Sequence, residues 1–123
     1  MAHRVLGLDH VQLTIPVGAE PEAVTFYGDL LGLPQLPKPE ALAGRGGCWF
    51  QAGSMQLHLG ADAAFAPANK AHPALIVDGL DQLLTALDQA GHEVRSGATI
   101  DGITQVFTDD PFGNRIELIA ARS

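Results

Sequence analysis

The stretch LDHVQLTI, residues 8–15, alternates polar and apolar side chains and predicts a half-buried strand. Its polar residues, beginning with His10, then face one side of a sheet and its apolar residues face the other. HPALIVD, residues 72–78, predicts a second strand that also begins with a histidine. Each strand leads into apolar residues at helical spacing, and these stop at Gly32 in one half and at Gly91 in the other.

The remainder of each half predicts about three further strands. In the first half, residues 34–47 are expected to form a loop with room for one short strand, and CWFQ (48–51) pairs with MQLHL (55–59) in a hairpin. In the second half, the expected strands and final turn are EVRS (93–96), TQVFT (104–108), DDPFGN (109–114, the turn) and RIELIA (115–120). Neither half can bury its sheet alone, so the two are expected to join around a pseudo-twofold axis.

Composition sets limits on function. The 123 residues fit one domain, and a hydrophobic content of 46% is typical of a chain that folds. The net charge is −7 without a cluster of Lys or Arg, which argues against nucleic-acid binding. No apolar run approaches the length of a membrane span or of a signal peptide's apolar region, and Cys48 is the only cysteine, so a cytoplasmic location is expected.

Strand parity places a group of chemically versatile side chains on one face of the predicted sheet. His10, His58, His72 and Glu117 share this face, away from the apolar residues that pack under the helices. Imidazole and carboxylate groups are ligands for borderline or hard divalent cations, so His10, His72 and Glu117 are candidate metal ligands. An antiparallel sheet with one solvent-exposed polar face would show the same pattern. The residues alone are therefore consistent with a metal site and with an ordinary solvated face.

The same strand parity predicts which residues line a ligand cleft. Gln12, Gln56 and Arg115 lie on the faces of the candidate ligands, and Trp49 or its neighbour on the same strand faces the cleft. Arg115 is as consistent with binding a substrate carboxylate as with pairing to an acid in the cleft. We therefore take Gln12, Trp49, Gln56 and Arg115 as candidate substrate-binding residues.

The sequence resembles the vicinal oxygen chelate superfamily, which includes glyoxalase I, extradiol dioxygenases, fosfomycin-resistance thiol transferases and bleomycin-resistance proteins. The resemblance covers about residues 6–120 and rests on these segments: LDHVQLTI, FYGDLLGL, LHLG, HPALIVDGLDQLLTALDQAG and DDPFGNRIELI. It implies an α+β fold of two tandem βαβββ modules, about 6–60 and 71–121, within a single domain spanning 1–123. The modules would form a cup-shaped mixed sheet with the helices on its outer face.

In that family the first and last strands of each repeat donate metal ligands, which by position are His10, His58, His72 and Glu117. Glyoxalase I typically carries Glu where this chain has His58, so the resemblance leaves the isomerase reaction in doubt. It also leaves fosfomycin chemistry in doubt, because the chain is poor in Lys and Arg.

The resemblance implies a glyoxalase- or dioxygenase-like enzyme, that is a lyase, isomerase or dioxygenase dependent on Fe, Mn, Ni, Co or Zn. Its small substrate would chelate the ion through adjacent oxygens. His58 would be either a fourth ligand or the catalytic acid/base, since imidazole titrates near neutral pH. The alternative is a metal-free protein of the bleomycin-resistance type that binds or sequesters a small molecule.

The resemblance also implies a homodimer, because family members with a single pair of βαβββ modules, like this chain, are commonly dimers. We favour an exchanged arrangement, in which His10 and His58 of one chain meet His72 and Glu117 of the other. The 12-residue linker 60–71 permits either connection of the halves.

Overall fold

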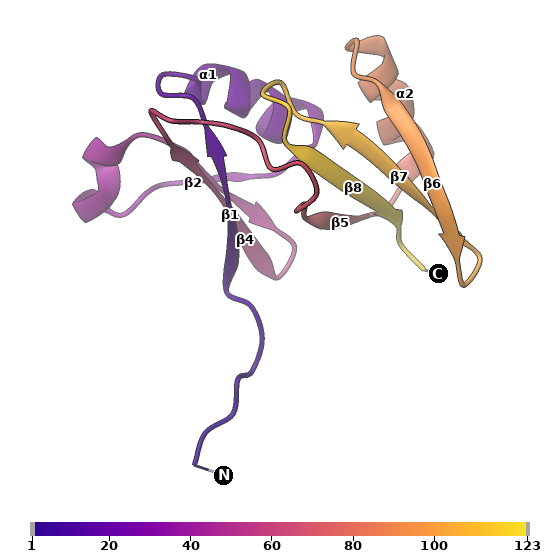
Figure 1. The fold of residues 1–123 in the computed structure, drawn as a ribbon, viewed down its shortest axis with the longest axis horizontal. Helices are drawn as coiled ribbons and strands as arrows, with labels where there is room; N and C mark the ends of the chain where they lie inside the picture. The colour runs from indigo at the N-terminus through magenta and orange to yellow at the C-terminus, as the bar shows by residue number, and fades with distance from the viewer. Residues whose placement is uncertain (1, 123) are drawn as a thin grey trace.

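The computed structural model describes residues 2–122, which form two four-stranded mixed sheets side by side (Figure 1). The first sheet has the order β1-β4-β3-β2 and the second β5-β8-β7-β6. In each, the first strand runs parallel to its neighbour and the other pairs are antiparallel. The strands are β1 (His10–Ile15), β2 (Gln35–Leu36), β3 (Cys48–Ala52), β4 (Met55–Ala61), β5 (Ala74–Val77), β6 (Val94–Ile100), β7 (Ile103–Asp109) and β8 (Arg115–Ala120). The two modules predicted from the internal repeat are thereby confirmed.

Helices cover one side of both sheets (Figure 1). The first consists of α1 (Glu20–Ala23) followed by a π-helical segment, η1 (Val24–Leu30), and the second is α2 (Leu80–Gln89). A 3-10 segment, η2 (Glu40–Arg45), lies in the loop before β3. Ala23, Phe26 and Tyr27, which recur at helical spacing, are buried. No helix among residues 2–122 has the length and apolar character needed to cross a membrane.

The boundaries of four predicted strands need correction. The strand predicted at 72–78 begins only at Ala74, because Pro73 has no N–H to donate to the ladder, although its carbonyl accepts from the Glu117 N–H. The strand predicted at 8–15 begins at His10. The strands predicted at 93–96 and 104–108 extend to a two-residue turn, Asp101-Gly102, whose positive φ values of 51° and 80° suit a tight hairpin.

The apolar faces of the sheets share one core with the helices. Ile15, Leu57, Leu59, Ile116 and Leu118 are all 2% exposed or less, as strand parity predicts. The opposite faces of both sheets lie away from the helices.

A hydrogen-bond network joins the two modules beneath the helices. The Tyr27 hydroxyl donates to Asp110 Oδ2 at 2.6 Å, and Asn114 Nδ2 donates both to the same oxygen and to the Thr14 carbonyl, each at 2.9 Å. The DDPFGN turn predicted from its Pro and Gly therefore also connects the second module to the first.

Candidate metal and ligand site

The first module brings together two of the four candidate ligands. His10 on β1 and His58 on β4 stack with ring centroids 4.1 Å apart, and Trp49 on β3 covers the other side of His58 at 3.7 Å. The register places Trp49 directly across from His58, whereas His10 pairs with Gln56, two residues from His58 on the same face of the sheet. His58 is only 4% exposed, whereas the side chain of His10 is 43% exposed.

Hydrogen bonds orient both imidazole rings. His58 Nε2 lies 2.8 Å from Gln56 Oε1, and His10 Nδ1 lies 2.9 Å from Asp9 Oδ2. Burial, followed by the proximity of His10, lowers the pKa of His58. His58 is therefore a neutral imidazole near pH 7, the form that binds metals and accepts protons.

The second module brings together the other two candidates. His72 Nε2 lies 2.9 Å from Glu117 Oε1 on β8, and His72 Nδ1 lies 2.8 Å from the Lys70 carbonyl oxygen. Hydrogen bonds raise the pKa of His72, chiefly the one to the Lys70 carbonyl and next the one to the Glu117 carboxylate. An imidazole nitrogen and a carboxylate oxygen are both ligands of divalent cations, so His72 and Glu117 would hold such an ion together.

The two pairs do not meet within one chain. Among residues 2–122 there is no group of three or more His, Cys, Asp or Glu side chains placed to hold a metal ion. The three predicted ligands His10, His72 and Glu117 are thus divided, with His10 beside His58 on the first sheet and the other two on the second. Each sheet presents half of the predicted donor set.

The candidate substrate-binding residues divide in the same way. Trp49 and Gln56 contact His58, and Gln12 is exposed on the same face. Arg115 lies over the Phe107 ring at 5.8 Å, and Phe107 in turn meets His72 edge-on at 5.5 Å.

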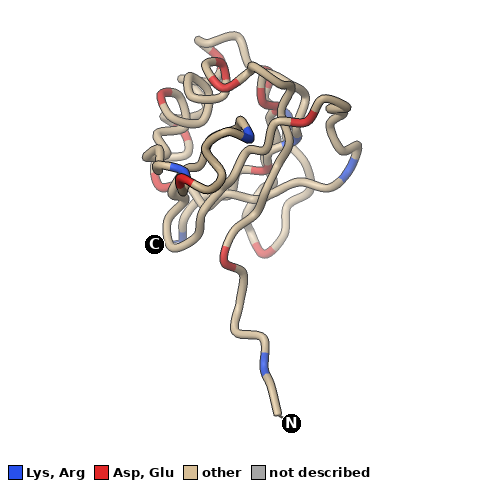
Figure 2. The backbone as a smooth tube through the Cα atoms, turned by 90° about the vertical axis from the view of Figure 1, so that its left-hand side faces the viewer, with Lys and Arg blue, Asp and Glu red and all other residues tan. Residues whose placement is uncertain are grey.

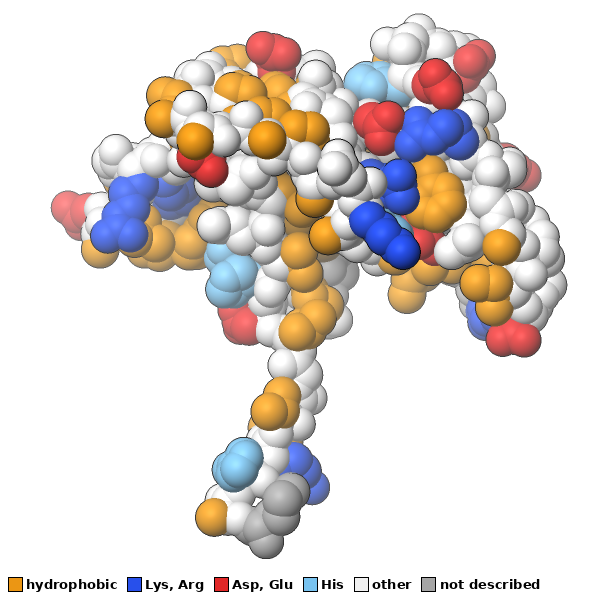
Figure 3. Space-filling model, viewed as in Figure 1, with side chains coloured by type: hydrophobic (Ala, Val, Ile, Leu, Met, Phe, Trp, Pro, Cys, Tyr) orange, Lys and Arg blue, Asp and Glu red, His pale blue; other side chains and the backbone are white. Residues whose placement is uncertain are grey.

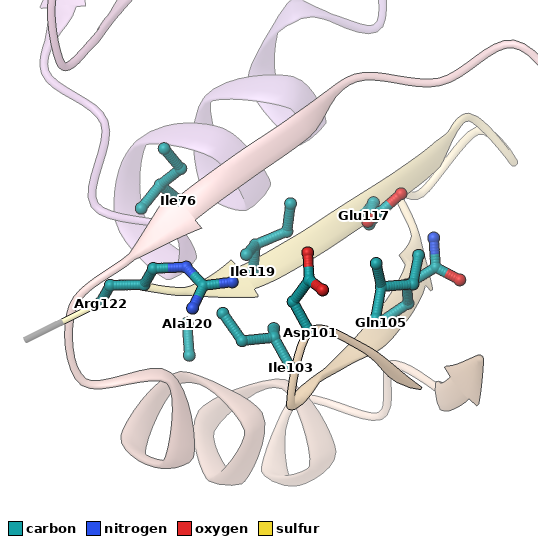
Figure 4. A pocket seen from close by; sticks show the side chains of 9 residues that line it. Ile76, Asp101, Ile103, Gln105, Glu117, Ile119, Ala120 and Arg122 are labelled. Carbon is teal, nitrogen blue, oxygen red and sulfur yellow. The ribbon is translucent and has the colours of Figure 1, made fainter. Parts of the chain in front are cut away.

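An apolar groove of about 410 Å³ lies beside Glu117 on the second sheet (Figure 4). Four isoleucines line it: Ile76, Ile100, Ile103 and Ile119. Asp101, Gln105 and Arg122 supply its polar groups. Our sequence analysis missed this groove, although parity carried a signal, because Ile76 and Ile119 alternate in step with His72 and Glu117.

Comparison with known proteins agrees with this architecture. The model of the Glyoxalase/Bleomycin resistance protein/Dioxygenase superfamily matches residues 7–118. The chain belongs to this superfamily. No curated protein matches the chain significantly.

Solved structures of the superfamily share the fold. A glyoxalase family protein from Bacillus anthracis has a TM-score of 0.92 at 42% identity, with 99% of this chain and 100% of that chain covered. Lactoylglutathione lyase from Agrobacterium tumefaciens has a TM-score of 0.71 at 21% identity, covering 94% and 93%. The fosfomycin resistance protein FosX from Listeria monocytogenes has a TM-score of 0.76 at 13% identity, covering 97% and 96%. At such low identities the last two show a common fold alone.

Proposed function

We propose that this chain is a divalent-metal-dependent enzyme whose site is completed by a second copy of the chain. His10 and His58 of one protomer would meet His72 and Glu117 of its partner. The observation that carries the proposal is the division of the donors into two preformed pairs, each on the sheet face turned away from the helices. A small substrate would bind through two adjacent oxygens.

The sheet edges support this assembly. Within the described chain, β1 pairs only with β4 and β5 only with β8, so each module keeps one open edge beside its donor pair. Because the strand order is the same in both modules, a twofold axis can bring β1 of one protomer against β5 of the other. Closed homo-oligomers form most often by such self-complementary contacts.

The donor set fits a divalent cation. Two imidazoles with one carboxylate suit Fe, Mn, Ni, Co or Zn, and His58 is placed as a fourth ligand or as the acid/base. A bound ion would act as a Lewis acid toward oxygens of the substrate and lower the pKa of bound water. Gln56 orients the His58 ring, and Arg115 and Gln12 can hydrogen-bond an anionic or polar substrate.

A second function is favoured by the isoleucine groove. Its apolar walls suit a hydrophobic small molecule, which the protein could sequester without metal. Metal content after purification without a His-tag separates the two functions. A stoichiometric metal supports the enzyme, and a metal-free protein that binds apolar ligands supports sequestration.

Metal titration tests the donor set directly. Calorimetry of the chelator-treated protein with Mn(II), Ni(II), Zn(II) and anaerobic Fe(II) should show about one ion per chain. Glu117→Ala should weaken binding more than His58→Ala, because Glu117 is the only carboxylate of the set, and Gln12→Ala serves as a control on the same face. Binding weaker than about millimolar for all four ions would contradict the proposal.

Subunit complementation tests whether the site is shared. His10→Ala and Glu117→Ala proteins are each purified, then unfolded together and refolded. In an exchanged heterodimer one site collects both substitutions and the other collects neither, so about a quarter of all sites should regain full affinity. If each site lies within one chain, every site keeps one substitution and no affinity returns, although mass spectrometry shows heterodimers.

A further inference from the structure

A second groove, which we call the helix groove, lies on the helical side of the molecule, opposite the sheet faces that carry the four donors (Figure 1). Its volume of about 530 Å³ falls within the range of small-molecule sites. Its lining comes from both modules: residues of α1 and η1 supply one part, and Ala90, His92 and Pro111 supply the other. A ligand in the helix groove would therefore contact both modules at once.

The interior of the helix groove is largely apolar. Phe26 is 1% exposed and meets the His92 ring edge-on, with ring centroids 4.9 Å apart. Leu30 and Pro111 line the groove beside them. Such a surface suits the hydrocarbon part of a ligand, because apolar carbon that binds there is removed from water.

The rim of the helix groove is acidic. Glu22 and Asp29 both line it and are exposed, and none of the ion pairs within residues 2–122 involves either carboxylate. No Lys or Arg lines the groove, and α1, η1 and α2 contain Asp and Glu without any Lys or Arg. Figure 2 shows red segments along the helices, and Figure 3 shows red side chains at the upper, helical edge of the molecule. This uncompensated negative charge favours a cationic ligand.

The spacing of the two carboxylates favours an elongated ligand. Glu22 and Asp29 are seven residues apart along one helical segment, which places them on the order of 10 Å apart along its axis. A single metal ion holds its oxygen ligands within about 2.6 Å, and side chains two helical turns apart do not converge that closely. A ligand with two positively charged ends, joined by an apolar chain, satisfies both carboxylates and the groove between them.

The helical wall of the groove has an unusual backbone. η1 is π-helical, and the Leu31 N–H donates to the Phe26 carbonyl, five residues back, at 2.9 Å. The π-helix is rare and occurs frequently at functional sites. Its presence along the helix groove therefore agrees with a ligand site there.

We propose that the helix groove binds an extended aliphatic polyamine, a ligand with ammonium groups at both ends of an apolar chain. One ammonium group pairs with Glu22 and the other with Asp29. The methylene chain between them lies on Phe26, Leu30 and Pro111. This site is separate from the metal donors and needs no metal.

Calorimetry with spermidine tests the charge pairing. At about 0.1 M salt, where charges beyond about 10 Å are screened, one spermidine should bind per chain. A Glu22→Gln/Asp29→Asn protein should bind it about tenfold more weakly, because two exposed ion pairs are lost. Glu40→Gln/Asp81→Asn is the matched control, since it removes the same charge from two exposed acids outside the groove, and should weaken binding less than about twofold. No spermidine binding, or equal weakening in the two double variants, overturns the inference.

Filling the groove tests the position of the ligand without changing charge. Thr25 lines the helix groove, is exposed, and donates its hydroxyl to the Pro21 carbonyl at 3.1 Å. Thr85 on α2 is also exposed and donates to the Asp81 carbonyl at 3.1 Å, but it does not line the groove. Thr25→Trp should therefore abolish spermidine binding, and Thr85→Trp should leave it unchanged. Full affinity in a Thr25→Trp protein that melts at the temperature of the Thr85→Trp protein overturns the inference.

The remaining comparison separates the helix groove from the proposed metal site. All titrations are run in chelator, and Glu117→Gln, which removes the only carboxylate of the donor set, should bind spermidine with the affinity of the wild type. A loss of spermidine binding in Glu117→Gln protein places the polyamine on the sheet face and overturns the inference. Spermidine binding in a protein that takes up no metal contradicts the proposed function and leaves the helix groove standing.

Discussion

The carboxylate of Asp110 is expected to be the most costly polar group to remove. It is 4% exposed and accepts four hydrogen bonds: from the Tyr27 hydroxyl, the Phe112 N–H, the Asn114 N–H and Asn114 Nδ2, at 2.6–2.9 Å. Asp110→Ala leaves all four donors without their acceptor. At about 1–1.5 kcal/mol for each bond, the free energy of unfolding should fall by about 4–6 kcal/mol.

The neighbouring residue supplies a matched control. Asp109 makes a bidentate ion pair with Arg95, but its side chain is 44% exposed and that of Arg95 is 37% exposed. Asp109→Ala should therefore cost no more than about 1 kcal/mol. Urea unfolding followed by far-UV circular dichroism measures both. If Asp110→Ala costs no more than Asp109→Ala, the network does not hold the modules together.

Tyr27 adds a pH dependence to the same network. Burial, followed by the negative charge of Asp110, raises the pKa of Tyr27 far above its ordinary value of 10.0. Below pH 10 the hydroxyl is protonated in both states and its contribution is complete. Above pH 10 only the unfolded chain ionises, so stability should fall by about 1.4 kcal/mol per pH unit until the folded pKa is reached. Tyr27→Phe should cost about 1.5–3 kcal/mol at pH 7 and remove this alkaline slope, which is measurable because Tyr27 is the only tyrosine.

Two further predictions concern the sheets. Leu57→Ala should lower the free energy of unfolding by about 2–5 kcal/mol in urea titrations, because Leu57 is 2% exposed in the core. Gln12→Ala on the opposite face should change it by no more than about 0.5 kcal/mol, and similar losses at both positions would contradict the assignment of the two faces. Gly47→Ala should cost about 1–3 kcal/mol in the same measurement, because Gly47 has φ 83° and an added Cβ would collide with the Leu59 carbonyl oxygen. Gly44→Ala, where the Cβ would meet nothing within 4 Å, should be tolerated, and equal effects at the two glycines would contradict the steric argument.

Local patterns were sufficient to predict the modules because each is built from short-range rules. Alternation in 8–15 and 115–120 separates the core face from the polar face, and the glycines at 32 and 91 mark the helix ends. Repetition of the pattern then predicts two similar sheets. The alternation of a strand and the spacing of a helix are periodic patterns of apolar residues, and both can be read from the sequence without knowledge of the fold.

Contacts between distant segments could not be predicted in the same way. Nothing in the residues around Tyr27 indicates that its hydroxyl binds Asp110, 83 positions away. Parity predicts a polar face for His58, but its burial depends on Trp49 and His10 stacking against it from two other strands. The separation of the donors into pairs follows from how the modules pack, which periodicity does not specify.

The division of the donors has a thermodynamic consequence if the site is shared. Among residues 2–122 of a single chain, at most two of the proposed donors lie together, whereas the proposed dimer would bring three or four together. An ion that binds the dimer more tightly than the separated chains must strengthen dimerisation by the same factor, since coupling between two equilibria is reciprocal. An ion at the shared site would therefore tighten a dimer that also forms without it. Sedimentation equilibrium of the wild-type protein with and without Mn(II) should therefore show a lower dissociation constant with the ion. Glu117→Ala should abolish the difference, and the same dissociation constant in both conditions would place the ion, if it binds at all, outside the interface.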